Sequence, residues 1–390
     1  MSLSKPCAAP AVAASVTGVL HPDAVYEILL RLPAKELCRL RAVCRPWRSL
    51  LSDLQFIVAH SARHPEPLIV AGYDTGYRGD GVLFDIINLS GQVVKRVRST
   101  APTGGRGNER VASIQSRLVC ITDETGLSCR LLDPATGSVC AFAKQFPEEV
   151  SPCYSHRYNA LVAFGQVGPA GVYKALRIVD HSFIWPPVYE VCTLDGSSHA
   201  PWREKQTPTY GFRLSFLHSV VINGKVYFLT DLQVHNEQDQ IAYFDLETEK
   251  WSPSIMGPLS SVANNGDDDG LPNNHIDCLN LSLAELNGCL VVVCRTVSSS
   301  LDLWFLKDFE KDLWVKKYSF QVNLSAHLSE FYLHPLLVLN DGRIVTYLGN
   351  RGSLRIYDPS TSNYTEVLMN KCVSVGLYTG SLLSLANSAK

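Results

Sequence analysis

The chain has 390 residues, which suggests two or three domains, or one large β domain with an appendage, at about 100 to 200 residues per domain. Hydrophobic residues make up 46% of the chain and charged residues 18%, against about 25% charged in typical soluble proteins, so a mostly disordered chain is excluded. The 35 basic and 37 acidic residues leave a formal net charge of −2. The chain therefore lacks the overall positive field with which proteins bind nucleic acid or an anionic membrane, and we expect neither partner.

Cysteine usage points to a reducing compartment. Twelve cysteines are scattered from Cys7 to Cys372 without a C-x-x-C pair. They make up about 3% of the residues, well below the roughly 8–10% at which short secreted chains form disulfide scaffolds. We therefore expect reduced, mostly buried thiols and a cytoplasmic and/or nuclear protein.

The first 18 residues are expected to form a disordered N-terminal arm. The stretch from Ala8 to Val19 has the outline of a signal peptide, but it is built mainly of Ala, Pro, Ser and Thr and contains no Leu. It lacks the strongly apolar centre that secretion signals carry.

Three short helices are predicted between Leu20 and about Ala62. The first opens at Pro22 and ends before Pro33, the second begins near Ala34, and the third follows Pro46. Apolar residues recur at helical spacing in each helix. They are Val25, Ile28, Leu29 and Leu32 in the first, Leu37, Leu40, Val43 and Cys44 in the second, and Trp47, Leu50, Leu51 and Leu54 in the third.

This small helical unit needs a partner surface. Below roughly 40–50 residues a single core rarely offsets the entropy of the chain, and the unit carries more large apolar groups than three helices can hide. Seven basic residues and four acidic ones give it a local charge of +3. An acidic protein partner would suit that rim, and an ordinary solvated helical face is an equally good explanation.

The run from Leu20 to Leu50 resembles the F-box. The F-box pattern has an L-P-x-D opening, an I-L-x-R-L-P centre and a V-C-K/R-x-W-R-x-L close. This run departs from the pattern in that His21 separates Leu20 from Pro22. The resemblance implies docking onto the Skp-type adaptor of a cullin-RING ubiquitin ligase, and through it onto the cullin and RING subunits. The implied adaptor contacts are Pro22, Ile28, Leu29, Leu32, Pro33, Leu37, Leu40, Val43, Cys44, Trp47 and Leu50. Periodicity alone would also allow a helical cap packed on the larger domain.

From Pro67 onward the pattern predicts an all-β domain. Short apolar or alternating runs are separated by Gly, Pro, Asn and Asp, without a long amphipathic helix. One phrase recurs: a strand that ends near an Asp, then a turn, then a strand with an aromatic residue. It occurs at Phe84-Asp85, Leu132-Asp133, Val179-Asp180, Phe244-Asp245, Lys307-Asp308 and Tyr357-Asp358.

A repeat of about 50 residues built from short strands is typical of propeller blades, so the six phrases predict about six blades. We expect the Asp to cap the turn through its side chain and a Gly or Asn to supply the left-handed residue. Two longer intervals call for insertions, at Asp195–Tyr210 and Ser260–His275. The uncharged stretch Cys372–Ala389 is nominally long enough for a membrane span, but its glycines and serines favour a last strand and a frayed tail.

The same region resembles the F-box-associated propeller domain of plant F-box proteins. The likeness is clearest in Leu283-Ala-Glu-Leu-Asn-Gly, Leu301-Asp-Leu-Trp-Phe-Leu-Lys-Asp and Leu354-Arg-Ile-Tyr-Asp-Pro-Ser-Thr. We therefore expect an α+β multidomain protein, in which a three-helix F-box is followed by an all-β propeller. The expected boundaries are residues 1–18 for the arm, 19–65 for the F-box and 67–385 for the propeller.

Motifs for catalysis are absent from the sequence. It contains no G-x-S-x-G elbow, no H-E-x-x-H pair and no phosphate loop. The acidic run Asp267-Asp268-Asp269 lacks the spacing of an EF-hand and is expected to be a solvated loop. We expect no metal, no cofactor and no enzymatic activity in this chain.

The expected function is that of a substrate receptor, in which the head recruits the ligase and the propeller loops hold a target protein. The alternative is a non-degradative scaffold or a glycan-binding F-box protein, and an enzyme with an attached F-box is a remote third. Aromatic and Arg residues in predicted loops are the candidate target contacts. They are Tyr73, Tyr77, Arg78, Arg106, Arg110, Trp202, Arg203 and His235.

Overall fold

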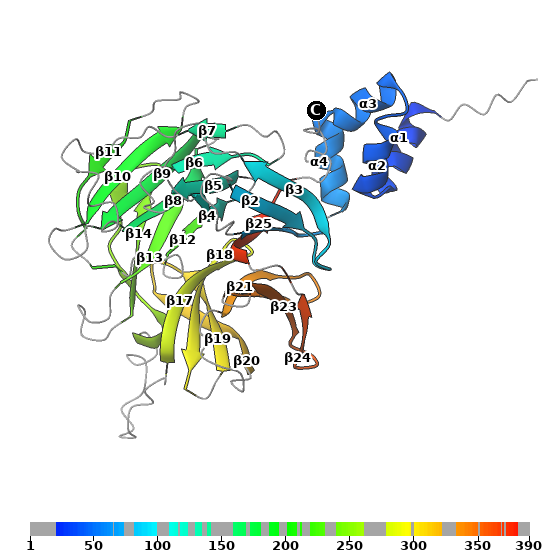
Figure 1. Cartoon of the computed structure of the whole chain (residues 1–390). Helices are drawn as coiled ribbons and strands as arrows, with labels where there is room; N and C mark the ends of the chain where they lie inside the picture. The colour runs from blue at the N-terminus through cyan, green and yellow to red at the C-terminus, as the bar shows by residue number, and fades with distance from the viewer. Residues whose placement is uncertain are drawn as a thin grey trace, which may run out of the picture. The chain divides into compact units, whose positions relative to one another are not determined.

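Figure 1 shows the computed structural model of the chain. The described ranges are 21–64, 66–73, 82–99, 109–115, 118–123, 129–134, 139–141, 159–168, 172–180, 187–194, 201–208, 211–212, 219–230, 239–260, 278–297, 300–321, 333–349, 352–367, 369 and 372–380. The expected arm, residues 1–18, lies outside them. Residues 21–64 belong to one compact unit and the described residues from 66 to 380 to another.

The first unit consists of helices. They are α1 (Pro22–Arg31), α2 (Ala34–Leu40), α3 (Arg45–Ser52) and α4 (Leu54–Arg63). Pro33 ends the first helix as predicted, because the residue before a proline is pushed out of helical geometry; Leu32 is extended.

The prediction of three helices is wrong, because the third predicted helix is divided at Asp53. This residue has extended backbone angles, and its carboxylate Oδ1 accepts hydrogen bonds from the backbone N–H groups of Gln55 and Phe56, at 2.8 and 3.3 Å. Such a cap starts a new helix by satisfying its first free donors. A fourth helix, α4, therefore follows the F-box-like pattern of the sequence.

The core of the helical unit draws on all four helices. It contains Leu29, Leu30, Ala34, Leu37, Leu51, Phe56 and Ile57, with Leu32, Leu40, Trp47 and Leu50 packed against it. Tyr26 of α1 lies edge-on to Phe56 of α4, with ring centroids 5.1 Å apart. This core is small, as expected for about forty residues.

The second unit contains six antiparallel sheets, which we number as blades in chain order. Blade 1 holds β1 (Leu68–Tyr73), β2 (Val82–Ile87), β3 (Val93–Ser99) and β25 (Cys372–Tyr378). Blade 2 holds β4 (Glu109–Gln115), β5 (Leu118–Asp123), β6 (Cys129–Leu132) and β7 (Val139–Ala141). Blade 3 holds β8 (Asn159–Val167), β9 (Val172–Asp180), β10 (Val188–Leu194) and β11 (Arg203–Lys205).

The remaining blades follow the same order. Blade 4 holds β12 (Ser219–Ile222), β13 (Lys225–Leu229), β14 (Gln240–Asp245), β15 (Lys250–Trp251) and β16 (Ile255–Met256). Blade 5 holds β17 (Cys278–Leu286), β18 (Cys289–Thr296), β19 (Ser300–Asp308) and β20 (Leu313–Gln321). Blade 6 holds β21 (Leu333–Val338), β22 (Ile344–Leu348), β23 (Ser353–Asp358) and β24 (Asn363–Val367). The six predicted blades are thus confirmed.

The innermost strands close the propeller into a ring. In ring order, β25, β4, β8, β12, β17 and β21 each contact the innermost strands of the two neighbouring blades. The last strand, β25, pairs with β1, so the end of the chain completes the blade that the beginning of the domain opened. This is the final strand predicted from the uncharged C-terminal stretch.

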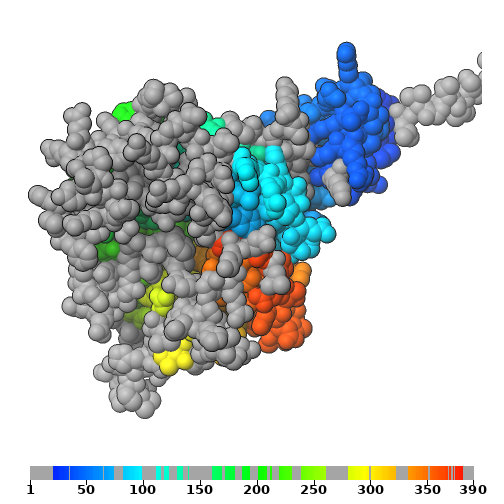
Figure 2. All heavy atoms as spheres, viewed as in Figure 1, coloured from blue at the N-terminus to red at the C-terminus, as the bar shows by residue number. Residues whose placement is uncertain are grey.

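Apolar cores fill the seams between blades. Blades 3 and 4 share a cluster that includes Leu176, Val191, Phe228 and Phe244, and blades 4 and 5 share another that includes Ile241, Leu283 and Trp304. The outer strands are less covered, as Figure 2 shows for β3 at the surface, where Val93 and Val94 are exposed. The seams therefore carry the hydrophobic stabilisation, and the outer edges face solvent.

The Asp-containing turns are confirmed in several blades. The Asp245 carboxylate accepts from the backbone N–H of Glu247 at 2.8 Å, and Asp308 and Asp358 cap the equivalent turns of blades 5 and 6. The expected Gly or Asn in left-handed geometry is wrong at these turns. Glu249, Asp312 and Ser362 take that geometry, with φ of 56°, 49° and 56°.

At two of the six recurring phrases, the Asp does not lie at the turn after the third strand of a blade. Asp85 lies inside β2 and is held by the Arg96 guanidinium through two contacts of 2.7 and 2.8 Å, while Asn88 caps the following turn. Asp180 ends β9, the second strand of its blade, rather than the third. Residues 203–205 form β11, so part of the first predicted insertion belongs to the blade, whereas residues 261–275 lie outside the described ranges.

The aromatic residue of the recurring phrase ties neighbouring blades together. The indole N–H of Trp251 donates to the carbonyl of Gln206 at 3.1 Å, and that of Trp314 donates to the carbonyl of Met256 at 2.9 Å. In each case a Trp in one blade binds the backbone that precedes that blade in the chain. The repeat therefore encodes a contact between blades as well as a turn.

Replacing Trp314 with phenylalanine should lower the free energy of unfolding of the propeller by about 1–2 kcal/mol, because the half-buried Met256 loses the donor to its carbonyl. Trp304 of the same blade is a matched control. It is equally buried, but its indole N–H has no hydrogen-bond partner among the described residues. Urea unfolding followed by circular dichroism should show a smaller loss for Trp304→Phe, and equal losses would contradict the role of the hydrogen bond.

The described cysteines follow the expectation of reduced thiols only in part. Cys38, Cys44, Cys120, Cys192, Cys289 and Cys372 are free thiols. Cys294, which is fully buried on β18, is in a disulfide, contrary to the prediction of reduced thiols throughout.

Candidate functional site

The helical unit exposes a set of large apolar side chains. Ile28 on α1, Val43 between α2 and α3, and Leu54 and Val58 on α4 are 47%, 65%, 73% and 61% exposed. Pro22, Pro33 and Cys44 are exposed as well. So many uncovered apolar groups on so small a unit are typical of a surface that binds another protein.

The eleven residues predicted to contact an adaptor fall into three groups. Five are exposed: Pro22, Ile28, Pro33, Val43 and Cys44. Four are half-buried: Leu32, Leu40, Trp47 and Leu50. Two differ from the prediction, because Leu29 and Leu37 are 2% and 0% exposed and belong to the core of the unit. In this conformation they support the surface from within.

Hydrogen bonds of Arg41 and Arg48 fix the connection between α2 and α3 that carries Val43 and Cys44. The guanidinium of Arg41 is buried and donates to the carbonyl of Leu51 through Nε at 3.2 Å and Nη2 at 2.5 Å. Arg48 in turn donates through Nε to the carbonyl of Arg41 at 3.3 Å. These bonds hold the short connection between α2 and α3 against α3, and so hold the exposed Val43 in place.

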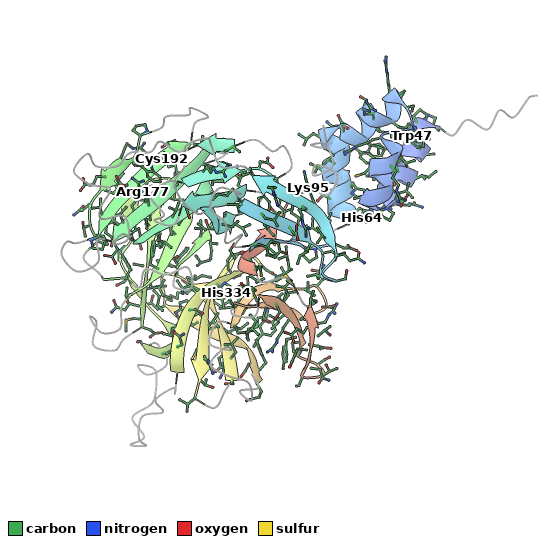
Figure 3. The ribbon with its side chains drawn as sticks, in the orientation of Figure 1. Trp47, His64, Lys95, Arg177, Cys192 and His334 are labelled. Carbon is green, nitrogen blue, oxygen red and sulfur yellow. The ribbon has the colours of Figure 1, made fainter. Side chains whose placement is uncertain are left out.

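His60 of α4 and His64, which directly follows α4, bind the end of α1. Nε2 of His60 lies 2.9 Å from the carbonyl of Leu32, and Nε2 of His64 lies 2.9 Å from the carbonyl of Leu30. The two rings stack with centroids 4.3 Å apart (His64 is labelled in Figure 3). The last carbonyls of a helix have no partner within it, so these side chains close the end of α1 and position Leu32 and Pro33.

The helical unit should lose stability as the pH falls below about 6.5, the ordinary pKa of histidine. Burial, together with the neighbouring His64, lowers the pKa of His60, so the unfolded state binds the proton first and stability rises with pH through this range. We expect amide hydrogen exchange in α4, corrected for intrinsic rates, to be less protected at pH 5.5 than at pH 7.5. The His60→Gln variant keeps a donor for Leu32 but cannot titrate, and its protection should change less. An equal change in protection in the wild type and in the His60→Gln variant would contradict the role of His60 in this pH dependence.

Leu54 and Val58 are surface residues that the sequence patterns missed. Leu54 fits the inward stripe of the predicted third helix, but the cap at Asp53 starts a new helix and turns Leu54 outward. The sequence signal that could have found this break is Asp53 itself, because Asp is one of the residue types preferred at the N-cap of a helix.

Half of the predicted target contacts lie outside the described residues: Tyr77, Arg78, Arg106 and His235. Of the other four, three lie on strands and not in loops as expected, and Trp202 directly precedes β11. Tyr73 is on β1, where burial beside Asp85 raises its pKa to about 12. Arg110 is on β4 and Arg203 on β11.

Trp202 is a core residue and not a loop contact. It is 7% exposed and packs in the seam between blades 2 and 3. Its ring lies 4.2 Å from the guanidinium carbon of Arg177, which is itself buried and paired with Glu190 at 2.6 Å. Figure 3 shows Arg177 and Cys192 together in this blade. Stacking on a buried cation explains why this Trp faces inward.

Arg203 belongs to an ionic cluster at the seam between blades 3 and 4. Glu249, at the β14–β15 turn, is bound by Lys174 at 2.8 Å, Arg203 at 2.6 Å and Lys205 at 2.5 Å. Burial alone would raise the pKa of Glu249, but the hydrogen bonds from the three cations lower it to about 2. Three cations around one carboxylate leave a local surplus of positive charge, which we call the basic cluster.

Metal-binding geometry was not found in the described part of the chain, where no three His, Cys, Asp or Glu side chains converge as ligands. Among the described helices, none is long and apolar enough to cross a membrane. The acidic run Asp267–Asp269 lies outside the described ranges.

Comparison with known proteins matches each of the two units to a known domain family. Residues 19–58 match the model of the F-box domain, and residues 88–375 match that of the F-box associated beta propeller domain. The Arabidopsis thaliana F-box protein At3g07870 is 24% identical over 388 residues, covering 90% of this chain and 88% of the relative. F-box/LRR-repeat protein At2g43260 of the same plant is 24% identical over 374 residues, covering 90% and 80%.

Among solved structures, a chain of a nidogen/laminin complex aligns with a TM-score of 0.40 and 11% identity over 80% of this chain and 97% of that one. The family assignment rests on the two domain matches, since the propeller match alone spans more than half of the residues. The chain belongs to the plant-type F-box proteins that carry an F-box-associated β-propeller domain.

Proposed function

We propose that this chain is the substrate-receptor subunit of an SCF-type cullin-RING ubiquitin ligase. The helical unit binds the Skp-type adaptor, which connects it to the cullin and RING subunits, and the propeller binds the target protein. The observation that carries the proposal is the exposed apolar set on the helical unit, which includes Ile28 and Val43, together with the half-buried Trp47. A partner that covers these side chains gains the hydrophobic free energy that the small unit leaves unused.

The receptor acts by proximity and supplies no catalytic residue of its own. Holding a lysine of the target beside a charged conjugating enzyme turns a bimolecular transfer into an effectively intramolecular one. The six-bladed ring suits this role, because its turns project from strands that are fixed by the inter-blade cores. We place the protein in the cytoplasm, the nucleus or both, where such ligases act.

Affinity purification of the full chain, with and without proteasome inhibition, tests the proposal. The adaptor and cullin should co-purify in both samples, and a target should accumulate only when the proteasome is inhibited. A partner that co-purifies equally in both samples, with an abundance that the receptor does not change, would favour the non-degradative scaffold. Failure to recover the adaptor would contradict the receptor role itself.

A further inference from the structure

A small notch opens between blades 4 and 5 of the propeller. It has a volume of about 250 Å³ and is lined by Ile222, Asn223, Lys225, Tyr227, Gly288, Cys289, Leu290 and Leu306. This is below the range of about 300–1,000 Å³ usual for pockets that bind whole drug-sized ligands. The space therefore suits one large side chain rather than a metabolite or a cofactor.

The wall of the notch is apolar and its rim is polar. Ile222 and Leu290 are buried in the core between the two blades, and Leu306 packs half-buried against that core. Gly288 and Cys289, at the start of β18, are exposed. An apolar side chain entering from this rim would cover the half-buried Leu306.

Lys225 provides a free positive charge at this rim. Its ammonium lies 4.6 Å from the centroid of the Tyr243 ring, and it forms no ion pair within the described part of the chain. Asp245 is its cross-strand neighbour, but one oxygen of that carboxylate accepts from the N–H groups of Glu247 and Thr248. A half-buried ammonium held over an aromatic face is a ready partner for a carboxylate.

The turns around the notch carry charges of both signs. The β12–β13 turn and the β14–β15 turn lie at the same end of the blade, since the N–H of Leu246 donates to the carbonyl of Gly224 at 2.9 Å. Glu249 of the second turn lies in the basic cluster with its three cations. On the other side, the acidic Asp308 of the β19–β20 turn is paired with Lys311 at 3.2 Å. The carboxylates of Asp245 and Glu285 also lie at this end, the latter accepting from the N–H of Gly288 at 2.5 Å, so the preference for an anionic group rests on the contact with Lys225 itself.

We infer that the notch is a docking site for an extended segment of the target protein, in which one large apolar side chain enters between blades 4 and 5 and a neighbouring carboxylate pairs with Lys225. The inference rests on the proposed receptor function for its biological meaning, and it can be tested without the ligase. Apolar burial provides the affinity, and the ammonium selects acidic neighbours.

The exposed thiol of Cys289 at the rim allows a direct test on the full chain. Three mixed disulfides of cysteamine serve as probes: one carries a phenyl ring and a carboxylate, one a phenyl ring and a carboxamide, and one a carboxylate without a ring. Modification of Cys289 under mildly reducing exchange is measured by peptide mass mapping. The exposed Cys44 of the helical unit is the internal reference for thiol reactivity.

The probe with both groups should modify Cys289 about fivefold more than either of the others, relative to Cys44, as an ion pair of about 1 kcal/mol would give. Lys225→Met keeps the apolar stem and should reduce this probe to the level of the carboxamide. Leu306→Gln should remove the advantage of the ring.

Equal modification by all three probes, or a probe preference that Lys225→Met leaves unchanged, would overturn the inference. If the carboxamide equals the carboxylate, the notch binds apolar groups without regard to charge, and the acidic neighbour is excluded. None of these results touches adaptor binding, so the receptor proposal would stand. Loss of adaptor binding with an intact probe preference would contradict the receptor proposal and leave the notch in place.

Discussion

Truncating Trp47 to alanine should weaken binding to the Skp-type adaptor by about 2 kcal/mol or more, roughly a 30-fold loss, and truncating Leu32 and Pro33 together should do the same. Trp47 packs against the core of the helical unit and remains half-exposed, close in sequence to the exposed Val43. A Trp with one covered and one open face is the typical anchor of an interface, because the partner completes its burial. Titration calorimetry with the full chain and the purified adaptor would measure the loss.

Folding and binding must be separated, because Trp47 and Leu32 also contact the core. Ile28→Asp and Val43→Asp place a charge on side chains that are already exposed, so they should abolish adaptor binding while leaving the helical circular dichroism unchanged. Arg39→Ala is the matched rim control. Arg39 is exposed and, among the residues that the structure describes, pairs only with Glu36 of its own helix, so its loss should cost under about 1 kcal/mol.

These variants should change adaptor binding without changing target binding. Target binding by the propeller should survive in all of them, because the two binding surfaces belong to separate compact units. If the Trp47→Ala, Pro33→Ala double variant held the adaptor as strongly as the wild type, the proposed surface would be wrong. If the wild type never held it, the scaffold function would take the place of the receptor function.

The sequence was sufficient for the architecture because its signals are local. A proline ends α1 through the geometry of the residue before it, and an Asp caps a turn through a hydrogen bond to an N–H two residues ahead. Such contacts are readable from spacing. The six phrases therefore predicted six blades, and the uncharged C-terminal stretch predicted the strand that closes the ring.

The misplaced residues depend on contacts between distant segments. Trp202 looks like a loop aromatic until β11 pairs with β10 and places the Trp over Arg177. Leu29 and Leu37 follow the same helical spacing as Ile28 and Val43, and the packing of the four helices into one core decides which of them is covered. The notch beside Lys225 could not be predicted either, because its lining residues come from two different blades and are far apart in the sequence.

Removing β25 should have the largest effect on the propeller. A chain that ends at residue 371 loses the strand that pairs with β1 and contacts β4 and β21, so the ring of inner strands opens and blade 1 gains an unpaired edge. It also loses the carbonyl of Cys372, which accepts from the Tyr347 hydroxyl at 2.9 Å. The expected loss exceeds about 5 kcal/mol, which is the scale of the entire stability of many domains. Circular dichroism and thermal unfolding should show no cooperative β transition, whereas a chain that ends at Gly380 keeps β25 and should unfold like the wild type.

A point substitution separates closure from mere loss of chain. A Cβ at Gly376 of β25 would lie 2.6 Å from Cβ of Ile114 on β4, so this residue must be small for the first and last parts of the ring to meet. Gly376→Ala should cost about 1–3 kcal/mol through overpacking, and Ile114→Val gives only partial relief because the clash involves its Cβ. A synthetic peptide of residues 372–380 added to the shortened chain should restore part of the cooperative transition, as pairing with β1 requires no covalent link. If the shortened chain unfolded at the wild-type midpoint, or if Gly376→Ala had no effect, the stability of the propeller would not depend on the closing strand.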